Sequence, residues 1–259
     1  DIDGEASGSP FGDQSGYSVS LSADGSIVAI GARYNDGNGT DSGHVRVYQY
    51  DNSSSQWNQL GEDIDGEEGG QFSGDESGYS VSLSADGSIV AIGAIGAKDS
   101  SGFVTGHVRI YQYNSSSTQW IQLGQDIDGE AEYDDSGHSV SLSADGSIVA
   151  IGAPKNDGNS TDSGHVRVYQ YNSSTSTWNQ LGEDIDGEGG QFIDDWSGYS
   201  VNLSADGSIV AIGAPRNNGN GTYSGHVRVY QDIFPSNILD KGIYGRTEYM
   251  SPEIQDIAL

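Results

Sequence analysis

Oxygen-bearing side chains recur in glycine-rich loops of this chain, and their spacing is suited to cation binding. Two loops share one pattern of acidic and amide residues: Asp36, Asn38 and Asp41, and Asp157, Asn159 and Asp162. Calcium prefers a shell of several carboxylate and carbonyl oxygens, which a loop of this composition can supply. These loops are therefore candidates for a calcium site. An ordinary turn is the favoured interpretation, because Asp, Asn and Gly also favour turns.

A further set of carboxylates lies in the phrase Asp-Ile-Asp-Gly-Glu, which recurs at residues 1–5, 63–67, 126–130 and 184–188. Its alternate carboxylates could hold a cation between neighbouring copies, with a solvated connection as the alternative. One histidine and one arginine also recur two positions apart: His44 and Arg46, His107 and Arg109, His165 and Arg167, and His226 and Arg228. We expect each guanidinium to pair with carboxylates of the next copy. We expect each imidazole to lie at a hydrogen-bonded strand edge, since a metal role would require several imidazoles to converge.

Aromatic residues that break the repeated pattern are the candidates for ligand contact. Trp196 follows two aspartates in a connecting loop, and Phe103 lies in a loop of the second copy. Loops carry binding residues more often than scaffold elements do, so we predict that both side chains face a ligand. The tryptophans that recur before Gln-Leu-Gly are expected instead to pack between neighbouring copies. These are Trp57, Trp120 and Trp178.

No group of residues in the sequence has the spacing of a known catalytic motif. Serine is abundant, but the chain has neither a Gly-x-Ser-x-Gly elbow nor a His-Glu-x-x-His zinc motif. We therefore predict that the protein is not an enzyme. A hydrolase or lyase that acts at the axis of the repeated units is the least favoured alternative.

The elements that position these side chains are copies of one unit. The stretch SGYSVSLSADGSIVAIGA at 15–32 returns almost unchanged at 77–94, 136–153 and 197–214. A period of about 60 residues suits a four-stranded propeller blade better than a helical-pair repeat. We predict one domain at 1–231, with repeats at about 1–62, 63–125, 126–183 and 184–231. We predict that residues 232–259, which do not follow the repeat, are a tail or cap.

Hydrophobic periodicity predicts four strands in each repeat. In the first repeat, residues 17–22 alternate larger and smaller side chains, and residues 27–32 are apolar on both faces. The Ala-Asp-Gly-Ser sequence between them predicts a tight turn. Residues 44–50 alternate again, and residues 57–61 supply an outer strand. The last repeat lacks the sequence of that outer strand.

Four strands joined in this way form an antiparallel meander, which must stack on its copies to be stable. The sequence therefore predicts an all-β propeller of about four antiparallel four-stranded blades. We favour a compact closed ring. The alternative is a partial propeller that belongs to a larger one.

Two short phrases resemble the FG-GAP repeat of integrin-α-type propellers. They are clearest in Gly198-Tyr199-Ser200-Val201 and Ile212-Gly213-Ala214-Pro215, and the resemblance covers roughly residues 7–231. It implies a non-catalytic, extracellular or cell-surface module for binding or adhesion, which recognises protein or carbohydrate through its loops. The alternative is a structural subunit of a larger assembly. The family's Asp-rich calcium loop is replaced here by Ser-Ala-Asp-Gly, whose one carboxylate cannot supply a calcium shell.

Composition narrows the range of partners. The chain has 38 acidic and 10 basic residues, for a formal charge of -28, which would repel nucleic acids. No apolar run is long enough to span a bilayer. The chain contains no cysteine, so disulfides and thiolate metal sites are excluded. Protein or carbohydrate ligands remain, together with self-assembly; no cofactor is expected other than calcium.

Overall fold

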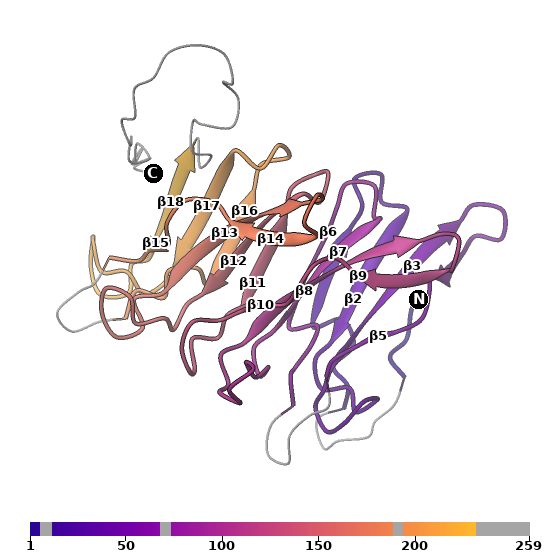
Figure 1. The fold of residues 1–259 in the computed structure, drawn as a ribbon, viewed down its shortest axis with the longest axis horizontal. Coiled ribbons are helices and arrows are strands. Elements are labelled where there is room, and N and C mark those ends of the chain that lie inside the picture. The colour runs from indigo at the N-terminus through magenta and orange to yellow at the C-terminus, as the bar shows by residue number, and fades with distance from the viewer. Residues whose placement is uncertain (6–11, 68–73, 189–193, 232–259) are drawn as a thin grey trace, which may run out of the picture.

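The computed structural model describes residues 1–5, 12–67, 74–188 and 194–231. Within these ranges every regular element is a strand, and the strands form four antiparallel sheets. The sheets follow one another along the chain and stack in a row, with the first and the fourth at opposite ends (Figure 1). The all-β prediction is confirmed. No helix in the described ranges is long and apolar enough to cross a membrane.

Each sheet is a meander whose strands follow the hydrophobic periodicity of the sequence. The first sheet contains β1 (Ser18–Leu21), β2 (Ile27–Ala32), β3 (His44–Asp51), β4 (Gln56–Gln59) and β5 (Ile64–Asp65). The second contains β6 (Ser80–Leu83), β7 (Ile89–Ala94), β8 (His107–Asn114), β9 (Gln119–Gln122) and β10 (Ile127–Asp128). The third contains β11 (Ser139–Leu142), β12 (Ile148–Ala153), β13 (His165–Asn172), β14 (Thr177–Gln180) and β15 (Ile185–Asp186). The fourth contains β16 (Ser200–Leu203), β17 (Ile209–Ala214) and β18 (His226–Gln231).

The outer edge of a sheet differs from the single fourth strand that the sequence predicted. In the first sheet, β4 pairs with the distal half of β3, at Tyr48 to Asp51. The two-residue strand β5 pairs with the other end of β3, at His44 and Val45. The outer strand is therefore split in two, and its second part comes from an Asp-Ile-Asp-Gly phrase. The phrases at 63–67, 126–130 and 184–188 each close the edge of the sheet before them, so the sheets and the sequence repeats are offset.

The tight turns between the first two strands of each sheet are held by one aspartate. Asp24 Oδ1 accepts hydrogen bonds from the Ser22 hydroxyl (2.8 Å) and from the Ser26 backbone (2.9 Å) and hydroxyl (2.8 Å). These bonds, those from Ser26 foremost, lower the pKa of Asp24 to about 2. Gly25 has a φ of 71°, which glycine adopts without strain. The carboxylate of this turn therefore serves the fold.

The hydrophobic core consists of the spaces between adjacent sheets. Ile27, Ala29, Val45 and Val47 of the first sheet pack against the second sheet, and equivalent clusters fill the next two junctions. The Trp120 indole nitrogen donates to the Leu60 carbonyl (2.7 Å), and the Trp178 indole nitrogen donates to the Leu123 carbonyl (2.6 Å). Packing of these two tryptophans between sheets is thus confirmed. Trp57 of the first sheet contacts Tyr50 of its own sheet.

The four sheets do not close into the compact ring that we favoured. Leu21 on the first sheet is 60% exposed, whereas its equivalents Leu83, Leu142 and Leu203 are each 7% exposed. On the fourth sheet Val227 is 65% exposed, whereas the equivalent Val45 is fully buried. The two end sheets therefore each leave one face uncovered. In a closed ring these faces would cover each other.

Candidate binding site at the loop end of the sheets

The long loops of all four sheets lie at the same end of the strands, which we call the loop end. It comprises the connections that precede the third strand of each sheet, at residues 33–43, 95–106, 154–164 and 215–225, and the segments just before each first strand. The Asn35 amide donates to Asp13 Oδ2 (3.2 Å), and the equivalent Asn156 and Asn217 make the same bond to Asp134 and Asp195. In these three sheets the buried pairs fix the loop to the segment that leads into the first strand. The loop end therefore has a defined conformation.

Aromatic rings from all four sheets form one row across the loop end. The residues are Tyr17, Tyr79, His138 and Tyr199, each at the position just before a first strand. Their ring centroids are 5.1 Å, 5.1 Å and 4.6 Å apart in that order, in tilted contacts. Such contacts are favourable for aromatic pairs. Burial lowers the pKa of His138, so its ring is neutral near pH 7. Stacking of the sheets thus turns one aromatic residue per repeat into a continuous row.

An arginine lies at each end of the row, one directly over Tyr17 and the other over Trp196, which stacks on Tyr199. The Arg33 guanidinium lies over the Tyr17 ring at 3.9 Å and over Tyr34 at 4.3 Å. At the other end, the Arg216 guanidinium lies 3.3 Å from the centre of the Trp196 ring. Trp196 in turn stacks on Tyr199, with centroids 6.0 Å apart and ring planes 7° apart. Cation–π contacts hold both arginines in place in an otherwise acidic protein.

The structure places the two predicted ligand-contacting aromatics differently. Trp196 is partly buried at one end of the row, with a φ of 55° and with an indole nitrogen that has no hydrogen-bond partner within the described ranges. Phe103 is 53% exposed and lies in the loop between β7 and β8. Asp99 Oδ1 shapes that loop by accepting hydrogen bonds from the backbone of Ser101 (2.8 Å) and Phe103 (3.0 Å). Both aromatics share the loop end, where ligand contact remains a prediction.

The loops predicted to bind calcium make internal hydrogen bonds. Asp36 Oδ1 accepts from the Asp41 backbone (2.9 Å), and Asp157 Oδ1 accepts from the Asp162 backbone (2.9 Å). The amides of Asn38 and Asn159 donate to the carbonyls of Gly66 (2.8 Å) and Gly187 (2.9 Å). In the fourth sheet the neutral Asn218 replaces the aspartate and accepts from the Tyr223 backbone (2.7 Å). A loop of this shape thus needs an oxygen acceptor at this position, and an amide suffices.

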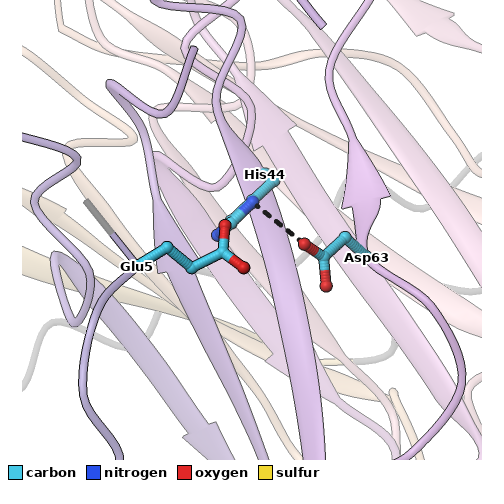
Figure 2. A group of neighbouring side chains, drawn as sticks. All are labelled: Glu5, His44 and Asp63. Carbon is cyan, nitrogen blue, oxygen red and sulfur yellow. Dashed lines mark ion pairs between the residues drawn. The ribbon is translucent and has the colours of Figure 1, made fainter. Parts of the chain in front are cut away.

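The repeated histidines and arginines meet the Asp-Ile-Asp-Gly-Glu phrases at the outer part of the loop end. In the first cluster, Glu5 and Asp63 lie on either side of the His44 ring, and His44 Nδ1 is 3.6 Å from Asp63 Oδ2 (Figure 2). Two more clusters of this kind are His107, Asp126 and Asp128, and Glu130, His165 and Asp184. In each cluster the candidate ligand atoms lie within 4.8 Å of one another. One imidazole nitrogen and two carboxylate oxygens form a donor set that suits a divalent transition metal.

Two carboxylates of these clusters, Glu5 and Glu130, also form ion pairs with the repeated arginines. Arg46 pairs with Glu5 (3.4 Å), Arg109 with Glu67 (3.7 Å) and Arg167 with Glu130 (3.4 Å), and Arg228 pairs with Glu188. Pairing of the repeated arginines with carboxylates is therefore confirmed. The partner is the edge segment that precedes each sheet, rather than the next copy as we expected. The arginine pairs tie each sheet to the segment before it, and each histidine cluster includes a carboxylate from the segment that follows its sheet.

Burial controls the charge of three of the repeated histidines, His44, His107 and His165. It lowers the pKa of His107 and of His165 to about 4, with the neighbouring arginine acting in the same direction. His44 is shifted in the same direction by burial. The contact between the histidines and the acidic phrases is not predicted from the sequence. Their joint recurrence, once per repeat, was the signal that could have linked them.

The stacked antiparallel sheets, each a meander of the same repeat, define an all-β repeat protein of the β-propeller class. The family model described as "FG-GAP repeat" matches residues 5–48 and 127–169, so the resemblance to this repeat is confirmed at both places. No curated protein sequence matches the chain.

Solved structures resemble the chain in fold at low sequence identity. Hydrazine synthase from Kuenenia stuttgartiensis has a TM-score of 0.50 and 14% identity, over 83% of this chain and 52% of that one. TolB from Acinetobacter baumannii has a TM-score of 0.41 and 18% identity, over 83% and 40%. Sqt1 from Saccharomyces cerevisiae has a TM-score of 0.47 and 13% identity, over 86% and 46%. The chain thus spans about half the length of these structures, and the first likeness shows a shared fold alone.

Proposed function

We propose that this chain is a non-catalytic binding module that recognises a protein ligand through its loop end, outside the cell or at its surface. The observation that carries the proposal is the row of Tyr17, Tyr79, His138 and Tyr199, with Arg33 over one end and Arg216 joined to the other through Trp196. Aromatic and arginine side chains supply most of the binding energy in protein interfaces. The row draws on all four sheets, so a ligand would contact the whole array.

The exposure of the row supports binding. Tyr17 and Tyr199 are each 44% exposed, and buried Asn–Asp hydrogen bonds hold the neighbouring segments in place. A rigid and partly exposed ring loses little conformational entropy when a ligand covers it. The tilted contacts turn successive rings away from one plane, which suits an irregular protein surface better than the flat face of a sugar.

The non-catalytic and extracellular parts of the proposal have separate support. His44, His107 and His165 are buried, so substrates would not reach them, and the chain has no cysteine nucleophile. The FG-GAP repeats favour a location outside the cell or at its surface. The strong negative charge favours ligands that present basic side chains around an apolar centre.

The test is binding of the purified chain to a panel of extracellular protein domains and, in parallel, to a glycan array. Arg216→Ala and Tyr199→Ala should each weaken binding to a protein hit by tenfold or more, as expected for central interface residues. Ile121→Ala is the matched control, because this side chain is 48% exposed but lies on β9, away from the row.

Two outcomes would overturn the proposal. Binding to glycans alone would replace the protein ligand with a carbohydrate. Equal binding by the row variants and the wild type would move the site away from the loop end. Esterase and glycosidase assays with the same samples should give no activity, and turnover that survives purification would overturn the non-catalytic part.

A further inference from the structure

The two end sheets expose faces that are buried at every junction inside the chain. The head face of the first sheet comprises Val19, Leu21, Val28 and Ile30. The tail face of the fourth sheet comprises Ala211, Gly213, Val227 and Val229. The second and third sheets bury both of the equivalent faces, because each has a neighbour on either side.

The internal junctions show what covers each face. At the junction of the first two sheets, Val81, Leu83, Val90 and Ile92 are the equivalents of the head face. They pack against Ala29, Val45 and Val47, which are the equivalents of tail-face residues. The same contact forms again between the second and third sheets and between the third and fourth sheets. Head and tail faces therefore fit each other, as three examples within one molecule show.

Polar groups repeat at the junctions as regularly as the apolar ones. The hydroxyls of Ser18, Ser80 and Ser139 donate to the carbonyls of Gly78, Gly137 and Gly198, at 2.7, 2.7 and 2.8 Å. The next members of these two series are Ser200 on the fourth sheet and Gly16 at the head of the first. A backbone bond also recurs, from Ala23 to Ala85, from Ala85 to Ala144 and from Ala144 to Ala205. The Ala205 N–H and the Ala23 carbonyl continue that series.

The close approach of backbones at a junction is also available at the tail face. A Cβ on Gly31, Gly93 or Gly152 would lie 2.2, 2.1 or 2.0 Å from a carbonyl oxygen of the following sheet. At the equivalent Gly213 it would meet only the Ser200 side chain of its own sheet, at 2.4 Å. The tail face thus retains the space into which a carbonyl of another sheet fits.

We propose that the head face of one chain docks on the tail face of a second copy of this chain. The contact repeats the internal junction, with Leu21 of one copy against Val227 of the other and with Ser200 donating to Gly16. Because the two faces differ, the association is head to tail and either closes into a ring or extends. The second copy is the occupant because it presents the surface that covers this face three times within the molecule.

Two features make this contact weaker than an internal junction. In the described ranges the fourth sheet has three strands, so Trp57 of the incoming copy lacks the carbonyl that its equivalents Trp120 and Trp178 find. Each chain also carries a formal charge of -28, which opposes association. We therefore expect association that strengthens with protein concentration and with added salt, since salt screens the repulsion.

The experiment is sedimentation of the full chain, alone and with variants that block one face each. Leu21→Lys blocks the head face and Val227→Lys blocks the tail face. Both substitutions reduce the negative charge, so a loss of association cannot come from greater repulsion. Asn52→Lys, at an exposed position in the turn between β3 and β4, is the control for the charge change.

The wild type and Asn52→Lys should associate at high protein concentration in 300 mM salt. At this ionic strength the Debye length is roughly 6 Å, so the repulsion between copies is largely screened. Each face variant alone should be a monomer. An equimolar mixture of the two face variants should form dimers and nothing larger, because one intact head and one intact tail remain. A monomeric wild type at high concentration would overturn the proposal, and so would association of either face variant with itself. Circular dichroism of each variant checks that it is folded.

Discussion

At the scale of single residues, burial decides which side chains carry charge. His107 and His165 lie beside carboxylates, which would favour protonation, yet their pKa falls to about 4 because neighbouring chain removes their water. Asp24 shows the opposite balance, since hydrogen bonds from Ser26 and Ser22 hold its pKa near 2 at an exposed turn. In both cases the surroundings in the folded protein decide the protonation state: burial favours the neutral imidazole, and hydrogen-bond donors favour the ionised carboxylate.

The lowered histidine pKa values predict a loss of stability in mild acid. Between about pH 6.5 and pH 4 the unfolded chain binds protons at these histidines and the folded chain does not, so the free energy of unfolding falls as the pH falls. For His107 the loss between pH 7 and pH 4.5 should be on the order of 2 kcal/mol. Urea titrations at both pH values measure it.

His107→Gln is the comparison for this prediction. It removes the titrating group, so its stability should change less between the two pH values than that of the wild type. Subtracting the two titrations cancels the contribution of Asp126, Asp128 and the other acidic groups around the imidazole. An equal pH dependence in both proteins would show that His107 is not protonated on unfolding in this range.

Calcium binding is decided by the same residues that shape the loops. We expect millimolar calcium to raise the melting temperature of the wild type, because the oxygens of Asp36 and Asp157 belong to the predicted site. Asp36→Asn combined with Asp157→Asn should abolish the rise. The double variant should fold normally without calcium, since Asn218 already makes the equivalent loop bond in the fourth sheet. Calorimetry of the wild type with no heat of binding would contradict the prediction.

At the scale of elements, the junction between sheets is the unit of stability. Gly93 lets the Gly137 carbonyl approach so closely that an added Cβ would lie 2.1 Å from it. Gly93→Ala should therefore force the second and third sheets apart and cost about 2 kcal/mol or more. Gly213→Ala is the matched control, because it meets only a serine hydroxyl of its own sheet and should cost less than about 1 kcal/mol. Urea melts at low protein concentration compare them, and equal losses would refute the junction argument.

The strands could be predicted from the sequence, whereas their outer edges could not. Alternation and the Asp-Gly turn placed the first two strands of each repeat within a residue or so of β1 and β2. The strand β5 has two residues, too few for any periodicity, and it pairs with His44 and Val45 only because the chain doubles back along β3. The aromatic row escaped prediction for a related reason. Its members are distant in sequence and meet through sheet stacking, which no local pattern specifies.

At the scale of the whole molecule, excess negative charge acts against the compact fold. The 10 basic residues can neutralise only a fraction of the 38 acidic ones, even though arginine pairs recur at every sheet. Added salt should therefore weaken the repulsion between the acidic side chains more than it weakens the attraction within the ion pairs. We expect the melting temperature to rise by several degrees between 20 and 300 mM sodium chloride, as measured at one low protein concentration. A fall would indicate that the ion pairs dominate.

The three internal junctions are built from equivalent apolar positions in the same order. Removing one sheet from the middle of the row, or inserting another, would therefore create no unmatched contact, because the new neighbours present the same two faces. The free energy of unfolding would change by the contribution of one sheet and one junction for each sheet removed or added. The number of sheets is thus a quantity that this architecture does not itself fix.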